Sequence, residues 1–466
     1  MSGHEVGLDG GERATFRPSG PLRGSLTPPA DKSISHRAAI IGAMADGPTR
    51  VTNFLDSDDT RSTLAAVARL GAMVNPEPLN GMPDEFVIEG VGPTGPRSFD
   101  RIDVGNAGTL MRLLPGWLAG VEGGLWRMDG DASIRQRPVD RIARPLAEMG
   151  AQIEVTDGRF PPIRIDGTSL EGIAYELPVA SAQVKSCILL AGLGANGPTT
   201  VIEPVATRDH TEVMLAAAGA DIVREPGRVT LNPGPTLSLD EVEVPSDISS
   251  AAFFLVAGSI VKGSEVVIDR CGVNPTRTGI IDILRRMGAD IEVEPQTGAE
   301  GEPIARITVR PSPLTGTRVD GAEIPLAIDE LPLLALAACF ASGETVIADA
   351  EELKAKESDR IAVVVDALSG FGAEIEALED GMRIIGSGGI RGGDVDSHGD
   401  HRIAMLGAIA GIASEQGVTV ENMDAAAVSY PAFQQDLKRL VVPVQSDSPL
   451  AASSSPTQSS IICHFS

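Results

Sequence analysis

Cations and hydroxyl groups are concentrated in one short stretch of this chain, "DKSISHR" at residues 31–37. The stretch contains Lys32, Ser33 and Arg37 and runs directly into the apolar segment "AAIIGAM". Ser and Asp are ordinary caps at the start of a helix, but cations at that end oppose the helix dipole. Capping alone therefore does not explain Lys32 or Arg37, and the pattern predicts an anionic ligand at this helix start.

Five further apolar segments begin in a similar way. Their polar starts are "GNAGT" (105–109), "ASAQVKS" (180–186), "SDISS" (246–250), "IDE" (328–330) and "GDHR" (399–402). At any one of these places, capping is a sufficient reading of the Ser, Asp, Asn or Thr. Arg112, Lys185 and Arg402, however, again bring a cation close to a helix start. The repetition favours a set of anion-binding helix starts over isolated caps.

Two more charged stretches could bind or protonate an anionic substrate. "RQRPVDRIARPL" (135–146) carries Arg135, Arg137, Arg141 and Arg144, and "ELKAKESDRI" (352–361) carries Lys354, Lys356 and Arg360 beside Glu357 and Asp359. The planar fork of Arg matches phosphate and carboxylate, whereas Lys is a mobile charge that can also transfer a proton. For the second stretch, a solvent-exposed helix with local Lys/Glu pairs is an open alternative.

Familiar nucleotide, metal and nucleophile motifs are absent from the sequence. There is no GxxxxGK[ST], and "GSGGIRGG" at residue 386 lacks the GxGxxG spacing. HExxH and GxSxG are missing, and the four cysteines show no metal-ligand spacing. We therefore expect no metal, no cofactor and no disulfide framework. The chemistry that these exclusions leave is acid–base catalysis on a substrate with several negative charges.

Acidic residues dominate the composition. The 466 residues include 38 Lys and Arg against 64 Asp and Glu, which gives a net charge of −26. Such a chain is unsuited to non-specific nucleic-acid binding, which needs a basic surface. With neither a signal peptide nor an apolar stretch that could span a bilayer, we expect no membrane partner and a cytoplasmic location. Residues 1–15 and the Ser/Pro-rich residues 443–466 are predicted to be a disordered extension and a disordered tail.

Two glycine signals alternate along the chain. One is a Gly before a short β-rich stretch, as in "GPTRV" at 47 and "GETVI" at 343; the other is a Gly-Ala pair before an alternating strand, as in "MGAQIEV" at 149 and "MGADIEV" at 287. Each follows a helical pattern, as expected when Gly ends a helix and leads into a strand. The chain is therefore predicted to form six α/β units, each built around one buried helix. If those helices pack parallel, their N-termini converge on one anion-binding face.

The ordered motifs of the chain resemble the 5-enolpyruvylshikimate-3-phosphate synthase family, in its bacterial branch with SAQ and RDHTE. The motifs are "DKSISHR", "GNAGTLMRL", "RQRPVDRI", "ASAQVKS", "TRDHTEVML", "KAKESDRI" and "GDHRIAM". The resemblance covers residues 18–441 and implies an α/β protein, a two-domain inside-out α/β barrel (the enolpyruvyl transferase fold) with six repeated units, three per domain. It implies a first domain at residues 25–246 and a second at 16–24 plus 247–442. We expect a monomer whose domains close on their ligands.

The resemblance also implies an activity and a set of site residues. The activity is transfer of the enolpyruvyl group of phosphoenolpyruvate to the 5-hydroxyl of shikimate 3-phosphate, with release of phosphate through a tetrahedral intermediate. The residues implied for shikimate 3-phosphate are Lys32, Ser33, Arg37, Ser181, Ala182, Gln183, Arg208, Asp329 and Lys356. Those implied for phosphoenolpyruvate are Lys32, Asn106, Gly108, Thr109, Arg137, Gln183, Arg360 and Arg402. Asp329 would accept the proton of the 5-hydroxyl. Lys32, Lys356 and Glu357 are candidates for protonating the methylene carbon.

One departure from the family pattern lies near the C-terminus. Many relatives have a Lys where this chain has Val428, in "AVSYPAF". One phosphoenolpyruvate cation is therefore predicted to be missing or replaced by Arg135, Arg141 or Lys354. Gly108 is retained, and an Ala in its place would crowd the inhibitor glyphosate. We therefore expect glyphosate to compete with phosphoenolpyruvate.

Two alternative functions remain open at this point. A UDP-N-acetylglucosamine enolpyruvyl transferase would share the fold and the donor, but that family has a Lys-Asn pair and a loop Cys. This chain has Lys32 followed by Ser33, and no Cys between Asn106 and Gly150. A non-catalytic repeat protein that binds anions would keep the cations of the helix starts without needing Asp329 and Glu357.

Overall fold

The structure, a computed structural model, describes residues 13–76, 83–92, 95–234, 236–297 and 301–442. The segments expected to be disordered at residues 1–12 and 443–466 lie outside the described residues. For residues 13–15 the expectation of disorder is wrong, because strand β1 (Arg13–Phe16) pairs antiparallel with β25 (Val418–Glu421). Ala14 and Phe16 are buried in the core, and that burial stabilises the strand.

One arrangement of strands and helices recurs through the chain. Its clearest copy is β6 (Phe99–Asp103), α3 (Gly108–Ala119), β7 (Leu125–Asp129), α4 (Asp140–Glu148), β8 (Gln152–Thr156) and β9 (Phe160–Asp166). The strands form a sheet in the order β6-β7-β9-β8, in which β6 and β7 are parallel and the other neighbours antiparallel. Each unit is therefore a strand, a helix, a strand, a second helix and a closing hairpin.

Three further copies follow this pattern, the last with its hairpin replaced. The first is β11 (Ala174–Glu176), α5 (Ala182–Gly192), β13 (Thr199–Ile202), α6 (His210–Ala217), β14 (Asp221–Glu225) and β15 (Arg228–Asn232). The second is β20 (Arg318–Val319), α10 (Leu331–Phe340), β21 (Ser342–Ile347), α11 (Arg360–Gly370), β22 (Glu374–Ala377) and β23 (Met382–Ser387). The third is β24 (Gly393–Asp396), α12 (His401–Ala413) and β25, with β1 as the third strand.

Two units exchange their first strand. The unit of α1 (Lys32–Met44), β3 (Pro48–Thr52), α2 (Asp58–Leu70), β4 (Met73–Asn75) and β5 (Glu85–Glu89) takes β16 (Glu241–Glu243) beside β3. The unit of α7 (Ile248–Ile260), β17 (Glu265–Gly272), α8 (Gly279–Arg286), β18 (Asp290–Gln296) and β19 (Ile304–Arg310) takes β2 (Arg23–Leu26) beside β17. The chain therefore crosses twice between these units, and a β-bridge from Ala30 to Ser246 joins the two crossings.

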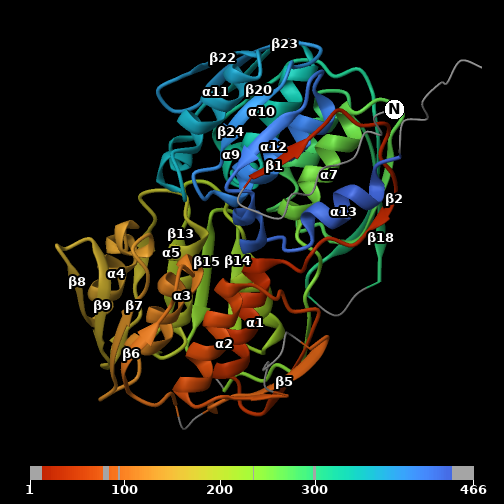
Figure 1. Cartoon of the computed structure of the whole chain (residues 1–466). Coiled ribbons are helices and arrows are strands. Elements are labelled where there is room, and N and C mark those ends of the chain that lie inside the picture. Colours follow the sequence, from red (N-terminus) through yellow and green to blue (C-terminus); the bar gives the residue numbers. More distant parts are fainter. Residues whose placement is uncertain (1–12, 77–82, 93–94, 235, 298–300, 443–466) are drawn as a thin grey trace, which may run out of the picture.

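The hydrophobic core consists of two clusters. One contains buried residues from Ala30 to Val244, and the other contains those of 14–26 together with 248–440. We call these parts the first half and the second half. In Figure 1 the first half is the lower, red-to-green part, and the second half is the upper, green-to-blue part together with the red β1. The remaining elements are β10 (Leu170–Glu171), β12 (Ala195–Asn196), α9 (Ile324–Ala327), α13 (Phe433–Leu440) and the 3-10 helices η2 (Ile134–Gln136), η3 (Gly321–Glu323), η4 (Glu351–Ala355) and η5 (Met423–Val428).

Six helices lie in the interior, as their composition predicts: α1, α3, α5, α7, α10 and α12. Most of their residues are buried on every side. Glycine lets α3 and α5 pack closely against each other, because a Cβ on Gly116 of α3 would lie 2.2 Å from the carbonyl oxygen of Cys187 in α5. Strands such as β5 alternate between exposed and buried residues. One face of each sheet therefore covers these helices, and the other face of the sheet is exposed to solvent. Among the described residues, no helix is long and apolar enough to cross a bilayer.

Candidate active site

A cavity of about 560 Å³ lies between the two halves. Residues at the start of all six interior helices line it: Lys32, Ser33, Gly108, Thr109, Ala182, Ser249, Asp329, His401 and Arg402. The helix starts that the sequence predicts to converge therefore do so. Their free backbone N–H groups and positive dipole ends favour an anion at this place.

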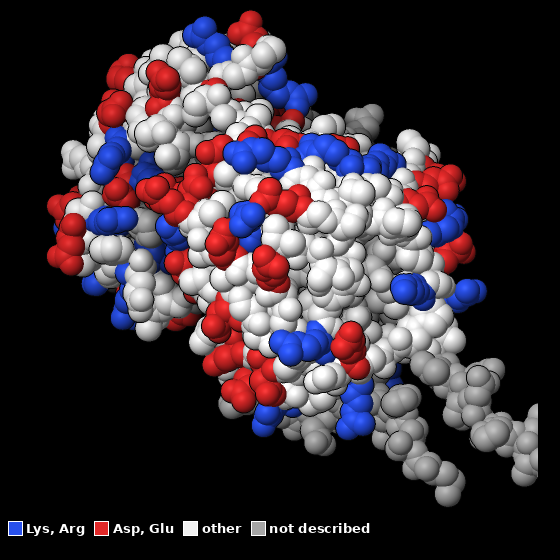
Figure 2. All heavy atoms as spheres, turned by 90° about the horizontal axis from the view of Figure 1, so that it is seen from above, with Lys and Arg blue, Asp and Glu red and all other residues white. Residues whose placement is uncertain are grey.

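Basic side chains outnumber acidic ones in the cavity wall. Seven Asp or Glu line the cavity, against ten Lys or Arg: Lys32, Arg37, Arg112, Arg137, Arg141, Arg208, Arg277, Lys356, Arg360 and Arg402. This excess stands out in a chain with a net charge of −26. On the outer face shown in Figure 2, by contrast, acidic and basic side chains are interspersed. The cavity is therefore the place where this acidic protein can attract an anion.

Asp329 is the carboxylate at the centre of the cavity cations. Its Oδ2 lies 2.5 Å from Arg208 Nη2, and its Oδ1 lies 3.3 Å from Lys356 Nζ and 3.4 Å from Arg360 Nη1. Arg402 Nη2 is 3.8 Å from Oδ2. Burial alone would raise the pKa of Asp329, but the attraction of Lys356, Arg208 and the other two cations outweighs it and holds that pKa well below its ordinary value. Arg208 belongs to the first half, so this cluster joins the two halves.

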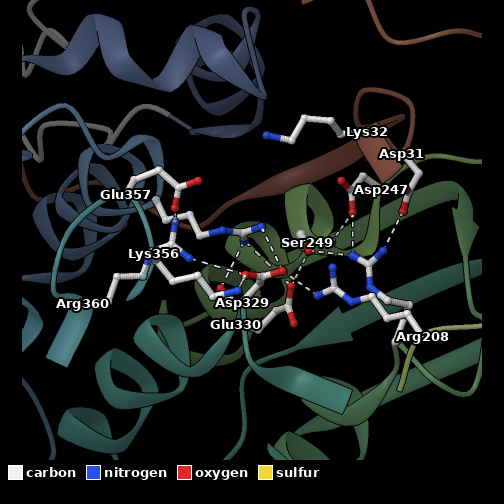
Figure 3. A network of polar contacts seen from close by, with 12 residues as sticks. Asp31, Lys32, Arg208, Asp247, Ser249, Asp329, Glu330, Lys356, Glu357 and Arg360 are labelled. Atoms are coloured by element: carbon white, nitrogen blue, oxygen red, sulfur yellow. Dashed lines mark hydrogen bonds and ion pairs between the residues drawn. The ribbon is translucent and has the colours of Figure 1, made fainter. Parts of the chain in front are cut away.

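Glu357 forms a second cluster of this kind (Figure 3). Arg360 Nη2 donates to Glu357 Oε2 at 2.6 Å, and Arg137 of the first half lies 3.7 Å from Oε1. Burial opposes ionisation of Glu357, but the surrounding charges, Arg360 foremost, keep its pKa well below the ordinary value. Asp400, the N-cap of α12, accepts from Arg360 Nε at 2.8 Å and fixes that guanidinium.

Arg37 and Arg112 line the cavity without a carboxylate in contact among the described residues. Arg37 donates through Nε to Thr211 Oγ1 at 2.7 Å and through Nη2 to Ser186 Oγ at 2.9 Å. Arg112 Nη1 donates to Gln183 Oε1 at 3.0 Å. Burial lowers the pKa of each guanidinium to about 10, which leaves both charged at neutral pH. A ligand anion would supply the counter-charge that these contacts do not.

Of the residues that the resemblance implies for the two substrates, Asn106 is the one that does not line the cavity. Its Oδ1 accepts from Arg137 Nη2 at 2.7 Å, so it orients a cavity cation instead. Gly108 does line the cavity, where a Cβ would lie 3.2 Å from Arg112 Nη1 and 3.3 Å from Arg137 Nη1. The start of α3 is therefore packed closely against two cations, and a side chain at position 108 would have little space.

The remaining site residues named from the sequence all line the cavity. They are Lys32, Ser33, Arg37, Thr109, Arg137, Ser181, Ala182, Gln183, Arg208, Asp329, Lys356, Glu357, Arg360 and Arg402. Ser181 caps α5, and Gln183 Nε2 donates to Thr109 Oγ1 at 3.2 Å. Lys32 Nζ lies 3.2 Å from Asp59 Oδ2. In the described part of the chain, no group of three or more His, Cys, Asp or Glu side chains could hold a metal ion.

Val428 lies at the end of η5 and is not among the cavity-lining residues. Of the three cations considered as replacements for the family's Lys, Arg141 lines the cavity and pairs with Glu352 of the second half at 2.8 Å. Arg135 and Lys354 make their contacts elsewhere and do not line it. Arg141 is therefore the candidate that the fold brings to the cavity.

A buried polar cluster at the two crossings was not named from the sequence as part of the site. Arg277 Nη1 lies 2.8 Å from Asp31 Oδ2, and its Nη2 lies 3.1 Å from Asp247 Oδ1 and 2.7 Å from Ser249 Oγ. Burial opposes ionisation of Asp31, but Arg277 outweighs it and lowers the pKa of Asp31 to about 2. Burial raises the pKa of Asp247. The two Asp are visible in the sequence as helix caps, whereas nothing near Arg277 in the chain indicates its partners.

Comparison with known proteins gives one consistent family. The family model EPSP synthase (3-phosphoshikimate 1-carboxyvinyltransferase) matches residues 16–437. A 3-phosphoshikimate 1-carboxyvinyltransferase from Desulfitobacterium hafniense is 49% identical over 420 residues, which are 90% of this chain and 95% of the relative. The structure of EPSP synthase from Acinetobacter baumannii has a TM-score of 0.83 at 44% identity and covers 92% of this chain and 98% of its own. The enolpyruvyl transferase NikO from Streptomyces tendae has the same fold, with a TM-score of 0.71 at 20% identity over 91% of this chain and 96% of its own. The predicted fold is confirmed.

Proposed function

Because the chain belongs to the EPSP synthase family and is a 3-phosphoshikimate 1-carboxyvinyltransferase, we propose that the cavity at the six helix starts is its active site. The enzyme transfers an enolpyruvyl group in the shikimate pathway. Its proposed substrates, phosphoenolpyruvate and shikimate 3-phosphate, each carry a phosphate and a carboxylate. The observation that supports this site is the excess of cations around the buried Asp329. Anions of this kind suit a cavity wall in which cations outnumber carboxylates.

The two substrates would occupy different sides of the cavity. We assign shikimate 3-phosphate to Lys32, Ser33, Arg37, Ser181, Ala182, Gln183, Arg208, Asp329 and Lys356. We assign phosphoenolpyruvate to Lys32, Gly108, Arg137, Gln183, Arg360 and Arg402, with Asn106 acting through Arg137. Arg137 and Arg360 come from different halves and both contact Glu357. They therefore hold the Glu357 carboxylate between them, and in the proposal they would bind an anionic group of phosphoenolpyruvate in the same way.

The proposed mechanism uses Asp329 as the general base. In the addition step, Asp329 accepts the 5-hydroxyl proton, the 5-oxygen bonds to C2 of phosphoenolpyruvate, and C3 gains a proton. In the elimination step, C3 returns a proton and the bond from C2 to the phosphate oxygen breaks, which restores the double bond. The leaving phosphate takes up the proton that Asp329 accepted, so that the Asp329 carboxylate is restored. Because its pKa is low, Asp329 must act chiefly through its orientation toward the hydroxyl. Glu357 is kept ionised by its low pKa and therefore has no proton to donate to C3, so we assign it the return of the proton from C3 and leave the donation to Lys32 or Lys356.

Phosphate release by the purified protein tests this proposal. We expect release from phosphoenolpyruvate only when shikimate 3-phosphate is added, and none with UDP-N-acetylglucosamine in its place. The absence of turnover with shikimate 3-phosphate would overturn the substrate assignment. Turnover with the nucleotide sugar would support the alternative transferase, and binding of both substrates without turnover would support a non-catalytic protein.

We further propose that the two halves are domains that close on the substrates. The predicted boundaries are 25–246 and 16–24 plus 247–442, and β2 extends the core of the second half to Leu26. Among the described residues, ion pairs between Arg137 and Glu357, Arg141 and Glu352, and Arg208 and Asp329 join the two sides of the cavity. We expect the radius of gyration from small-angle scattering to fall when shikimate 3-phosphate and glyphosate are both present. An unchanged radius would contradict closure, and the molecular mass from the same data tests the predicted monomer.

Gly108→Ala should weaken glyphosate more than phosphoenolpyruvate. The new Cβ would crowd two guanidinium groups of the proposed donor site, and the larger inhibitor has less room to adjust. We expect the glyphosate inhibition constant to rise about tenfold or more, with a smaller change in KM for phosphoenolpyruvate. Gly389→Ala is the control, because a Cβ there meets nothing within 4 Å. An inhibition constant that is the same in Gly108→Ala and wild type would refute the steric account.

A further inference from the structure

Glu330 is a buried carboxylate to which the proposed reaction gives no role. It follows Asp329 directly and is fully buried at the N-cap position of α10, yet its side chain makes no capping hydrogen bond. Its Oε2 has no hydrogen-bond partner among the described residues. A buried carboxylate with an unpaired oxygen costs folding free energy. Stability alone therefore does not account for a Glu at this position.

The other oxygen of Glu330, Oε1, has two polar contacts. Ser249 Oγ donates a hydrogen bond to it, and Arg402 Nη1 lies 3.8 Å away. Ser249 in turn accepts the hydrogen bond from Arg277 in the cluster at the crossings. Figure 3 shows Ser249 and Glu330 beside Asp329 in this network. The Glu330 carboxylate is therefore fixed from one side by α7 and faces the first turn of α12 on the other.

Arg402 has two anionic neighbours, which differ in the number of cations that they contact. Asp329 is shared by four cations, whereas Glu330 pairs with Arg402 alone among the described residues. Arg402 Nη1 also donates to the backbone carbonyl of Asp329 at 3.1 Å. During the addition step Asp329 would accept a proton and lose its charge. From that moment Glu330 is the carboxylate that still holds Arg402.

We propose that Glu330 is a positioning residue that holds Arg402 in the orientation needed for the reaction, with Ser249 fixing the Glu330 carboxylate. The proposal rests on the proposed function, in which Arg402 binds phosphoenolpyruvate. Glu330 lies behind Arg402 and acts on the substrate only through that guanidinium. A small displacement of a positioned cation is enough to reduce turnover strongly.

The test is a double-mutant cycle. Glu330→Gln keeps the shape of the side chain and an acceptor for Ser249 but removes the charge. We expect kcat/KM for phosphoenolpyruvate to fall about 10- to 100-fold. In an Arg402→Lys background the same substitution should change kcat/KM by less than about threefold, because both residues act through one contact. Equal fold-losses in the two backgrounds would overturn the proposal.

Two further variants separate positioning from general damage. Glu330→Asp keeps the charge and should recover part of the activity lost in Glu330→Gln; equal losses would contradict a role for the charge. Ser249→Ala should lower kcat/KM in the same direction but less. Glu344→Gln is the matched control, since Glu344 of β21 pairs with the exposed Arg383 of β23 and neither residue lines the cavity, and its kinetics should equal wild type.

A crystal structure of Glu330→Gln decides the proposal independently of turnover. We expect the Arg402 guanidinium to leave the carbonyl oxygen of Asp329. An unchanged contact would overturn the positioning role even if wild-type turnover is normal. Conversely, a displaced Arg402 together with a wild-type protein that does not turn over shikimate 3-phosphate would refute the proposed substrates while leaving the Glu330 contact established.

Discussion

Asp329→Asn should reduce kcat by about 10²- to 10⁴-fold, the usual contribution of a positioned general base. Binding of shikimate 3-phosphate should be retained or become tighter. The reason is that Asn releases Arg208 and Lys356, which the Asp329 carboxylate holds at 2.5 Å and 3.3 Å, and leaves them free for the substrate anion. Steady-state kinetics together with calorimetric titration of shikimate 3-phosphate measure the two effects separately.

The pH profile of the wild-type enzyme extends this prediction. The pKa of Asp329 is held well below its ordinary value, so its carboxylate is ionised throughout the range in which the protein can be assayed. Loss of kcat/KM between pH 7 and 5 should therefore not be caused by protonation of Asp329, because kcat/KM reports the groups of the free enzyme. Asp320→Asn, which alters an exposed pair with Arg318, is the control and should leave kcat unchanged. Near-normal turnover of Asp329→Asn would remove Asp329 from the mechanism.

Arg277→Met should destabilise the protein by about 3–5 kcal/mol, the range measured when one partner of a buried ion pair is removed. The guanidinium of Arg277 is buried between Asp31 and Asp247, and its loss leaves two buried carboxylates without their cation. Equilibrium denaturation at pH 7 measures the free energy of unfolding. Arg306→Met, which breaks a pair on the exposed surface with Asp269, is the control and should cause no measurable change.

The pH dependence of the destabilisation caused by Arg277→Met follows from the pKa of Asp31. That pKa is lowered to about 2 in the folded protein, below its ordinary value of 3.8. The ionised pair therefore contributes stability above pH 4, and the contribution is lost as the pH falls toward 2. The difference between wild type and Arg277→Met should shrink over that interval. A loss below about 1 kcal/mol at pH 7, or a difference that does not depend on pH, would contradict the role assigned to Arg277.

Local patterns in the sequence predicted the interior helices and the polar residues at their starts. Lys32, Arg112 and Arg402 could be named because each lies within a few residues of the start of an apolar helix, where a cation opposes the helix dipole and is not needed for capping. The convergence of these starts could be inferred because a repeated unit places equivalent residues at equivalent points of the fold. Comparison with the family then added roles that no single position reveals.

Long-range contacts account for what the sequence did not predict. Arg277 meets Asp31 across 246 residues of chain, and no local pattern carries information about such a partner. Glu330 was visible only as part of a helix start, because its contact with Ser249 spans 81 residues. Residues 13–15 of β1 were expected to belong to a disordered extension. A four-residue strand shows no period of its own, and its partner β25 lies about 400 residues away. These features depend on the assembled fold.

The pairing of the first two strands determines when they can fold during synthesis. β2 needs β17 at Glu265–Gly272, and β1 needs β25 at Val418–Glu421. At about 5–20 residues per second, the ribosome delivers these partners on the order of tens of seconds after the N-terminal strands emerge. Both strands are short and carry an Arg at the first position, which limits their tendency to pair with other nascent chains. The second half is therefore completed late, because residues 13–26 can take their places only after residues 265–272 and 418–421 have been made.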